Sequence, residues 1–72
     1  MNKDSIIATA LTVNLPEELR KKDYWCDGDE DFIYVYHGKD RVCIFSQHAD
    51  FTKVIERCKL HEKEMELNGK ER

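Results

Sequence analysis

The sequence predicts a small α+β domain, built from N-terminal helical segments, a central antiparallel β-hairpin and a long C-terminal helix. Two apolar runs flank a glycine–lysine turn within residues 31–46, which is typical of a hairpin. Apolar residues recur at three- and four-residue spacing over residues 50–68, which indicates an amphipathic helix. The length of 72 residues corresponds to one domain, which we expect to cover residues 1–68 and to end in a frayed tail at residues 69–72.

Residues 5–15 are compatible with a helix or with an edge strand. A helix would start at Asp4 as its N-cap and would bury Ile6, Ile7, Ala10 and Leu11. A strand would instead alternate Leu11, Val13 and Leu15 with polar residues. Helix propensities differ by only about a few tenths of a kcal/mol per residue, so they do not separate the two interpretations.

A second short helix is expected directly after this segment. Pro16 suits the first helical turn, and Glu17 and Glu18 suit the positive N-terminal end of a helix. Lys21 and Lys22 suit the negative C-terminal end. We expect this helix to end before residues 27–28, where an acidic turn leads into the hairpin.

Both faces of the predicted hairpin are apolar. A type II′ turn at Gly38 and Lys39 pairs Tyr36 with Arg41 and continues residue by residue along both strands. One face then carries Ile33, Val35, Val42 and Ile44, and the other carries Phe32, Tyr34, Tyr36, Cys43 and Phe45. The aliphatic face should pack on the C-terminal helix. The aromatic face and the strand edges need further cover, and a second copy of the chain is the simplest source.

The C-terminal helix has one clear apolar stripe. Asp50 is its expected N-cap, and the sequence Asn68-Gly69 is its expected end. The stripe consists of Phe51, Val54, Ile55, Cys58, His61 and Met65. This helix is longer than the hairpin, so its last turns should extend beyond the sheet, with Leu60 and Leu67 available for a second contact.

Composition predicts a soluble cytoplasmic protein without a cofactor. The net charge of −3 argues against sequence-blind binding to nucleic acid, which depends on neutralising many phosphates. Three cysteines without a C-x-x-C pair suit a reducing compartment and free thiols. The sequence contains no apolar run of membrane-spanning length and does not begin like a secretory signal.

Metal binding and catalysis receive little support from the motifs. A zinc site is a weak alternative, because one close ligand pair is present where two are usual; its ligands would be Cys26, Cys43, Cys58 and His61. The acidic residues 27–31 begin like a calcium loop, but the glycine and glutamate expected at its sixth and twelfth positions are absent. We expect no enzymatic activity, because the acidic neighbours of Cys26 should raise the pKa of that thiol.

Residues Leu11–Lys22, LTVNLPEELRKK, resemble the strand-then-helix start of ribbon-helix-helix DNA-binding proteins. The resemblance implies a dimeric nucleic-acid-binding regulator, in which Thr12 and Asn14 face the major groove. The basic triplet Arg20, Lys21 and Lys22 would contact phosphates. A hairpin follows, however, where that family has a second helix, so this function is kept as an alternative.

The function that we expect from the sequence is protein binding by a small acidic module, homodimeric and acting as an inhibitor or adaptor. Its aromatic contacts would be Tyr24, Trp25, Tyr34 and Tyr36, because aromatic side chains contribute strongly to interfaces. Asp27, Asp29, Glu30 and Asp31 would guide a partner electrostatically.

Overall fold

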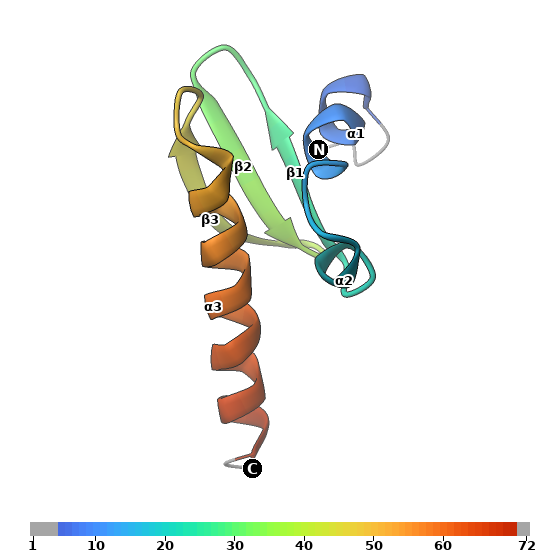
Figure 1. Cartoon of the computed structure of the whole chain (residues 1–72), viewed down its shortest axis with the longest axis vertical. Helices are drawn as coiled ribbons and strands as arrows, with labels where there is room; N and C mark the ends of the chain where they lie inside the picture. Colours follow the sequence, from blue (N-terminus) through green and yellow to red (C-terminus); the bar gives the residue numbers. More distant parts are fainter. Residues whose placement is uncertain (1–4, 71–72) are drawn as a thin grey trace.

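The structure is a computed structural model that describes residues 5–70, with side chains described as far as Leu67. Its elements are α1 (Ile6–Thr12), α2 (Glu17–Arg20), β1 (Tyr24–Gly28), β2 (Phe32–His37), β3 (Asp40–Ser46) and α3 (Phe51–Lys70). The strands form an antiparallel sheet in the order β1-β2-β3. The helix α3 lies across one face of this sheet, and α1 and α2 lie beside β1 (Figure 1). The predicted α+β fold is confirmed.

The N-terminal segment is helical, so the alternative of an edge strand is wrong. Its N-cap is Ser5, whose hydroxyl accepts a hydrogen bond from the Ala8 N–H at 3.0 Å. The predicted cap, Asp4, lies outside the described residues. The helix ends at Thr12, and the following turn leads to the short α2, which was also predicted.

The strand β1 was not predicted, because its aromatic start runs directly into acidic residues without an alternating pattern. Its backbone pairs with β2 from Tyr24 opposite His37 to Gly28 opposite Ile33. The other edge of β1 is closed by Thr12, whose Oγ1 accepts from the Cys26 N–H at 3.1 Å and donates to the Cys26 carbonyl at 3.3 Å. The helix α1 therefore takes the place of a further strand at this edge.

The turn of the hairpin is as predicted, but the register beyond it is not. Gly38 has a φ of 62°, as the first central residue of a type II′ turn requires, and Tyr36 pairs with Arg41. A β-bulge then makes Val42 an extra residue, and Val35 pairs with Cys43 instead. A shift of one residue exchanges the two faces of a strand.

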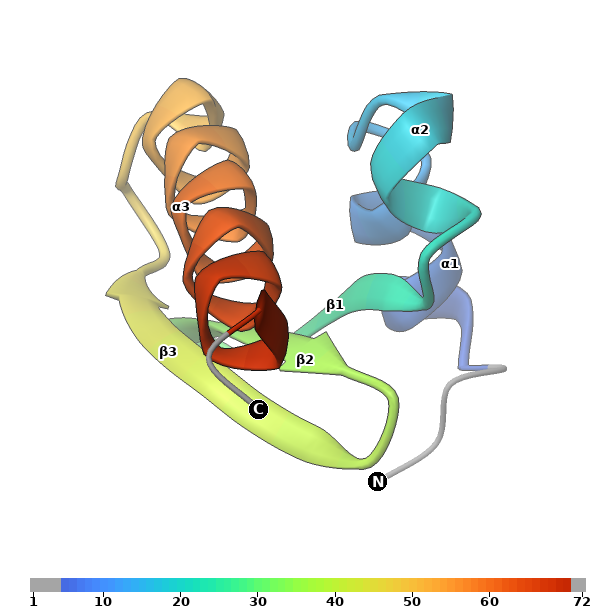
Figure 2. The same ribbon diagram turned by 90° about the horizontal axis from the view of Figure 1, so that it is seen from below.

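The faces of β3 beyond the bulge are consequently the reverse of those predicted. Cys43 and Phe45 join the core beneath α3, whereas Ile44 lies opposite Tyr34 on the other face and is 44% exposed. We call the face covered by α3 the inner face and the opposite one the outer face. Figure 2 shows α3 lying against the concave side of the curved sheet.

The main core lies between the inner face, α2 and α3. Its buried members are Leu15, Leu19, Tyr24, Cys26, Ile33, Val35, Val54 and Cys58. Around it pack partly buried side chains that include Phe51 and Ile55, which confirms the start of the predicted stripe of α3. The Asp50 cap is also confirmed, because Asp50 Oδ1 accepts from the Thr52 N–H at 3.0 Å.

The helix α3 continues to Lys70, past the stop predicted at Asn68-Gly69. Its last turns extend beyond the sheet, as expected from its length (Figure 1). Leu60 and Leu67, the predicted second line, are 50% and 53% exposed. Of the predicted tail, residues 71–72 lie outside the described residues.

Candidate functional site

The outer face carries an exposed apolar surface next to the acidic turn between β1 and β2. The strand register places Asp27, Tyr34 and Ile44 side by side across the three strands. Phe32 follows on the same face, with its ring centroid 6.3 Å from that of Tyr34. Phe32 and Ile44 are 46% and 44% exposed, and Tyr34 is half-buried. We call Phe32, Tyr34 and Ile44 the outer-face patch.

Asp29 holds the acidic turn and the patch together. Its Oδ1 accepts hydrogen bonds from the backbone N–H groups of Asp31 at 2.8 Å and Phe32 at 2.9 Å. Its Oδ2 accepts from the Tyr34 hydroxyl at 2.7 Å, and this bond is the main reason that the pKa of Asp29 is lowered. Asp29 therefore positions Tyr34, while Glu30 and Asp31 remain exposed.

The assignment of three predicted contact residues to an exposed surface is corrected, because these residues are buried. Tyr24 is 2% exposed, Trp25 is 5% exposed and Tyr36 is 4% exposed. Trp25 stacks on Tyr36, with ring centroids 4.6 Å apart, and its indole N–H donates to the Gly38 carbonyl at 2.9 Å. Ala8 of α1 completes this cluster. Trp25 and Tyr36 therefore form the part of the outer face that α1 covers, whereas Tyr24 belongs to the main core.

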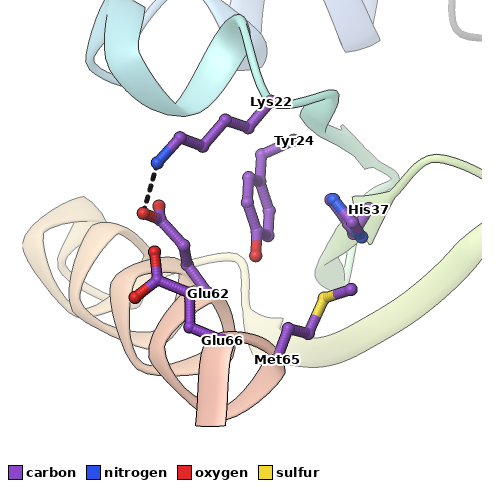
Figure 3. Close-up of a pocket in the computed structure, with 6 residues that line it drawn as sticks. All are labelled: Lys22, Tyr24, His37, Glu62, Met65 and Glu66. Carbon is purple, nitrogen blue, oxygen red and sulfur yellow. Dashed lines mark hydrogen bonds and ion pairs between the residues drawn. The ribbon is translucent and has the colours of Figure 1, made fainter. Parts of the chain in front are cut away.

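A pocket of about 310 Å³ lies at the opposite end of β1, between the sheet and α3 (Figure 3). An ion pair between Lys22 and Glu62 borders it, and Tyr24 forms its aromatic wall. The remaining lining residues are His37, Met65 and Glu66. The lining contains neither a thiol nor an aliphatic hydroxyl, so it offers no side chain of the kind that serine or cysteine hydrolases use as a nucleophile.

Behind the pocket, two histidines and Tyr24 form a compact group. The Tyr24 hydroxyl is hydrogen-bonded to His61 Nδ1 at 2.7 Å, and the His37 ring lies 4.5 Å from the Tyr24 ring between centroids. The two imidazole centroids are 5.4 Å apart. Burial, and next the nearby His37, lower the pKa of His61 from 6.5. Burial raises the pKa of Tyr24 to about 12.

The lowered pKa of His61 predicts a loss of stability in mild acid. The unfolded chain takes up a proton as the pH falls through 6.5, while folded His61 resists protonation until a lower pH. The free energy of unfolding should therefore decrease from about pH 7.5 to about pH 5.5, as measured by urea denaturation. A His61→Gln variant should show a flatter profile, and an equal slope in both proteins would contradict this assignment.

The four residues of the zinc alternative are not assembled as ligands. Cys26, Cys43 and Cys58 lie in the apolar core, and His61 is engaged with Tyr24. Within residues 5–67, no three side chains of His, Cys, Asp or Glu are grouped so that they could hold a metal ion. Burial raises the pKa of Cys26 to about 12 and that of Cys58 to about 11, so both thiols are protonated near neutral pH.

The segment Leu11–Lys22 lacks the strand of the ribbon-helix-helix start, because α1 extends to Thr12 and a turn follows before α2. Thr12 is committed to the backbone of Cys26, and Asn14 Nδ2 donates to the Ala10 carbonyl at 3.2 Å. Arg20 Nε donates to the Leu15 carbonyl at 3.1 Å. The remaining basic side chains form ion pairs, Lys21 with Glu17 and Lys22 with Glu62. Thr12, Asn14 and Arg20 of the predicted DNA-contact set therefore make hydrogen bonds within the chain, and Lys21 and Lys22 are paired with carboxylates.

Comparisons of this chain with protein-family models, curated proteins and solved structures gave no significant match. None of the helices in the described part of the chain combines the length and the apolar character that spanning a bilayer requires.

Sequence reasoning missed two members of the exposed surface, Phe32 and Ile44. Ile44 was assigned to the core-facing side, because a β-bulge leaves no mark in the hydrophobic pattern of a short strand. Phe32 is the first residue of β2 and directly follows the acidic residues. Its place at the start of a strand was the signal in the sequence that its ring would lie at the end of the sheet. The predicted Tyr34 and the four acidic residues do lie together with them at this end.

Proposed function

We propose that the protein is a small non-enzymatic protein-binding module, whose outer-face patch receives a partner segment with apolar and basic side chains. The observation that carries this proposal is the exposure of Phe32 and Ile44 on a sheet face that α3 leaves uncovered. Exposed apolar side chains that gather in one place are typical of interaction surfaces. For such a module we infer an inhibitor or adaptor role.

Charge complementarity supports a basic partner. Asp27 lies beside Tyr34 in the sheet register, and Glu30 and Asp31 are exposed at the adjoining turn. A negative rim around an apolar centre attracts positively charged segments and accelerates their association. The tyrosine supplies a side chain type that is enriched at interface centres, and its hydroxyl is already fixed by Asp29.

The test is the capture of partner proteins from a lysate of the source organism with the wild-type chain and with matched variants. Phe32→Ala should reduce the captured amount at least about tenfold, which corresponds to about 1.4 kcal/mol. The matched control is Val13→Ala, because Val13 is 58% exposed and lies at the end of α1 instead of on the sheet. Equal capture by Phe32→Ala and the wild-type chain would reject the patch as the binding surface.

The acidic rim is tested by a second pair of variants. Glu30→Lys should slow association and weaken the dependence of the association rate on salt, because the attraction is electrostatic. Glu64→Lys makes the same change of charge on an exposed position of α3 and should leave the rate nearly unchanged. An equal effect of both variants on the association rate would show that this rate depends on the net charge of the chain and not on the acidic rim.

A further inference from the structure

We propose that the free edge of β3 pairs in antiparallel fashion with β3 of a second copy, which joins the two sheets into one of six strands. The two edges of the sheet differ. At β1 the Thr12 hydroxyl closes the edge through both of its hydrogen bonds to Cys26. In the described part of the chain, no strand pairs with β3 on the side away from β2.

The hydrogen bonds that β3 still offers can be derived from its register. The Gln47 N–H donates to the Asp31 carbonyl at 3.0 Å, so every second residue from Gln47 backward directs its backbone groups toward β2. The alternate residues, Ile44 and Ser46, direct theirs away from β2. The Ser46 carbonyl accepts from the Ala49 N–H, which leaves both groups of Ile44 and the N–H of Ser46 for a new strand.

A two-fold axis at Ile44 satisfies the outward N–H and carbonyl groups of this residue. Each Ile44 then donates to and accepts from the Ile44 of the other copy. In this register Cys43 of each copy is opposite Phe45 of the other, so no charged side chains face each other between the bulge and the end of the strand. The two Ile44 side chains meet on the outer face, where each is 44% exposed in the single chain.

The side of α3 that borders this edge carries exposed side chains, among them Lys53, Glu56 and Leu60. Salt bridges of Lys59 with Glu18 and of Lys22 with Glu62 connect the other side of α3 to the region of α2. The bordering side forms a groove of about 280 Å³ with β3, lined by Phe45, Lys53, Glu56, Arg57 and Leu60. A second copy brings the same apolar and oppositely charged side chains to this groove.

The groove carries charged side chains of both signs, namely Lys53, Glu56 and Arg57. Glu56 lies in the same groove, so two copies related by a two-fold axis present a carboxylate and a guanidinium to each other. Because the β1 edge is closed, pairing stops at two copies instead of continuing into a fibre.

Sedimentation equilibrium tests this pairing with the full chain. The wild-type protein should have twice the 8.6 kDa mass of one chain. Ile44→Lys and Ile44→Glu should each be monomeric, because like charges meet at the axis, and an equimolar mixture of the two should recover the doubled mass. Ile6→Lys, at a residue 88% exposed on α1, is the matched control and should remain dimeric.

A monomeric wild-type chain would overturn the pairing, as would a dimer that withstands both Ile44 variants. Ser46→Pro adds an independent variant, because it removes an outward N–H without removing a bond to β2, and it should also be monomeric. Circular dichroism confirms that each variant is folded. Failure of this proposal is distinct from failure of the protein-binding function. The latter is measured by partner capture with Phe32→Ala, and this measurement can be made whether the chain is a monomer or a dimer.

Discussion

Replacement of Trp25 by Ala is expected to destabilise the fold by about 3–5 kcal/mol, the range for removing a buried aromatic side chain. Trp25 is 5% exposed, stacks on Tyr36 and donates its indole N–H to the Gly38 carbonyl. A chain of this size has a total stability of order 4–10 kcal/mol at about 0.05–0.15 kcal/mol per residue. The variant should therefore lose much of its stability, as measured by urea denaturation monitored by circular dichroism.

Two further variants separate the contributions of Trp25. Trp25→Phe keeps an aromatic ring against Tyr36 but removes the N–H donor, and it should cost about 1–3 kcal/mol because the Gly38 carbonyl loses its partner. Ile6→Ala, at an exposed position, should stay within about 0.5 kcal/mol of the wild-type chain. If Trp25→Ala left stability intact and abolished partner capture, Trp25 would be a contact residue and its assignment to the core would be wrong.

Replacement of Thr12 by Val is the second change with a large expected effect. Valine has nearly the shape of threonine but can neither accept from the Cys26 N–H nor donate to the Cys26 carbonyl. Cys26 is 0% exposed, so two backbone groups would be left unsatisfied away from water. At about 1–3 kcal/mol for each such group, the free energy of unfolding should fall by about 2–6 kcal/mol.

The control for this variant is Thr12→Ser, which retains the hydroxyl and should recover most of the stability. Opening the β1 edge should also allow pairing there, so Thr12→Val should form species larger than a dimer in size-exclusion chromatography. A Thr12→Val protein as stable as the Thr12→Ser protein would show that Thr12 does not close this edge.

The long-range pattern of the C-terminal helix made it predictable from the sequence. Val54 and Cys58 are both fully buried at the spacing that the stripe required, and Asp50 caps the helix as expected. The turn at Gly38 was predictable for a similar reason, because a two-residue connection between apolar runs leaves few alternatives. An element can be predicted from the sequence when its apolar residues repeat regularly over many positions, or when its turn has strict backbone requirements.

The features that the sequence did not reveal depend on tertiary contacts. The strand β1 exists because β2 and Thr12 satisfy its backbone on both sides, which no local pattern of Tyr24–Gly28 records. The bulge at Val42 reversed the faces of β3 and moved Ile44 from the expected core to the surface. The candidate site was predictable in its acidic part and in Tyr34, whereas burial of Trp25 and Tyr36 could not be distinguished from exposure.

Hydrogen–deuterium exchange of the chain with and without its captured partner tests the central claim most directly. The account predicts that binding slows amide exchange in residues 27–34 and 43–46, which carry the acidic turn and the outer-face patch. Residues around the pocket of Tyr24 and Met65 should be unaffected. Protection confined to that pocket or to α3, with no change in residues 27–34, would contradict the assignment of the outer face as the binding surface.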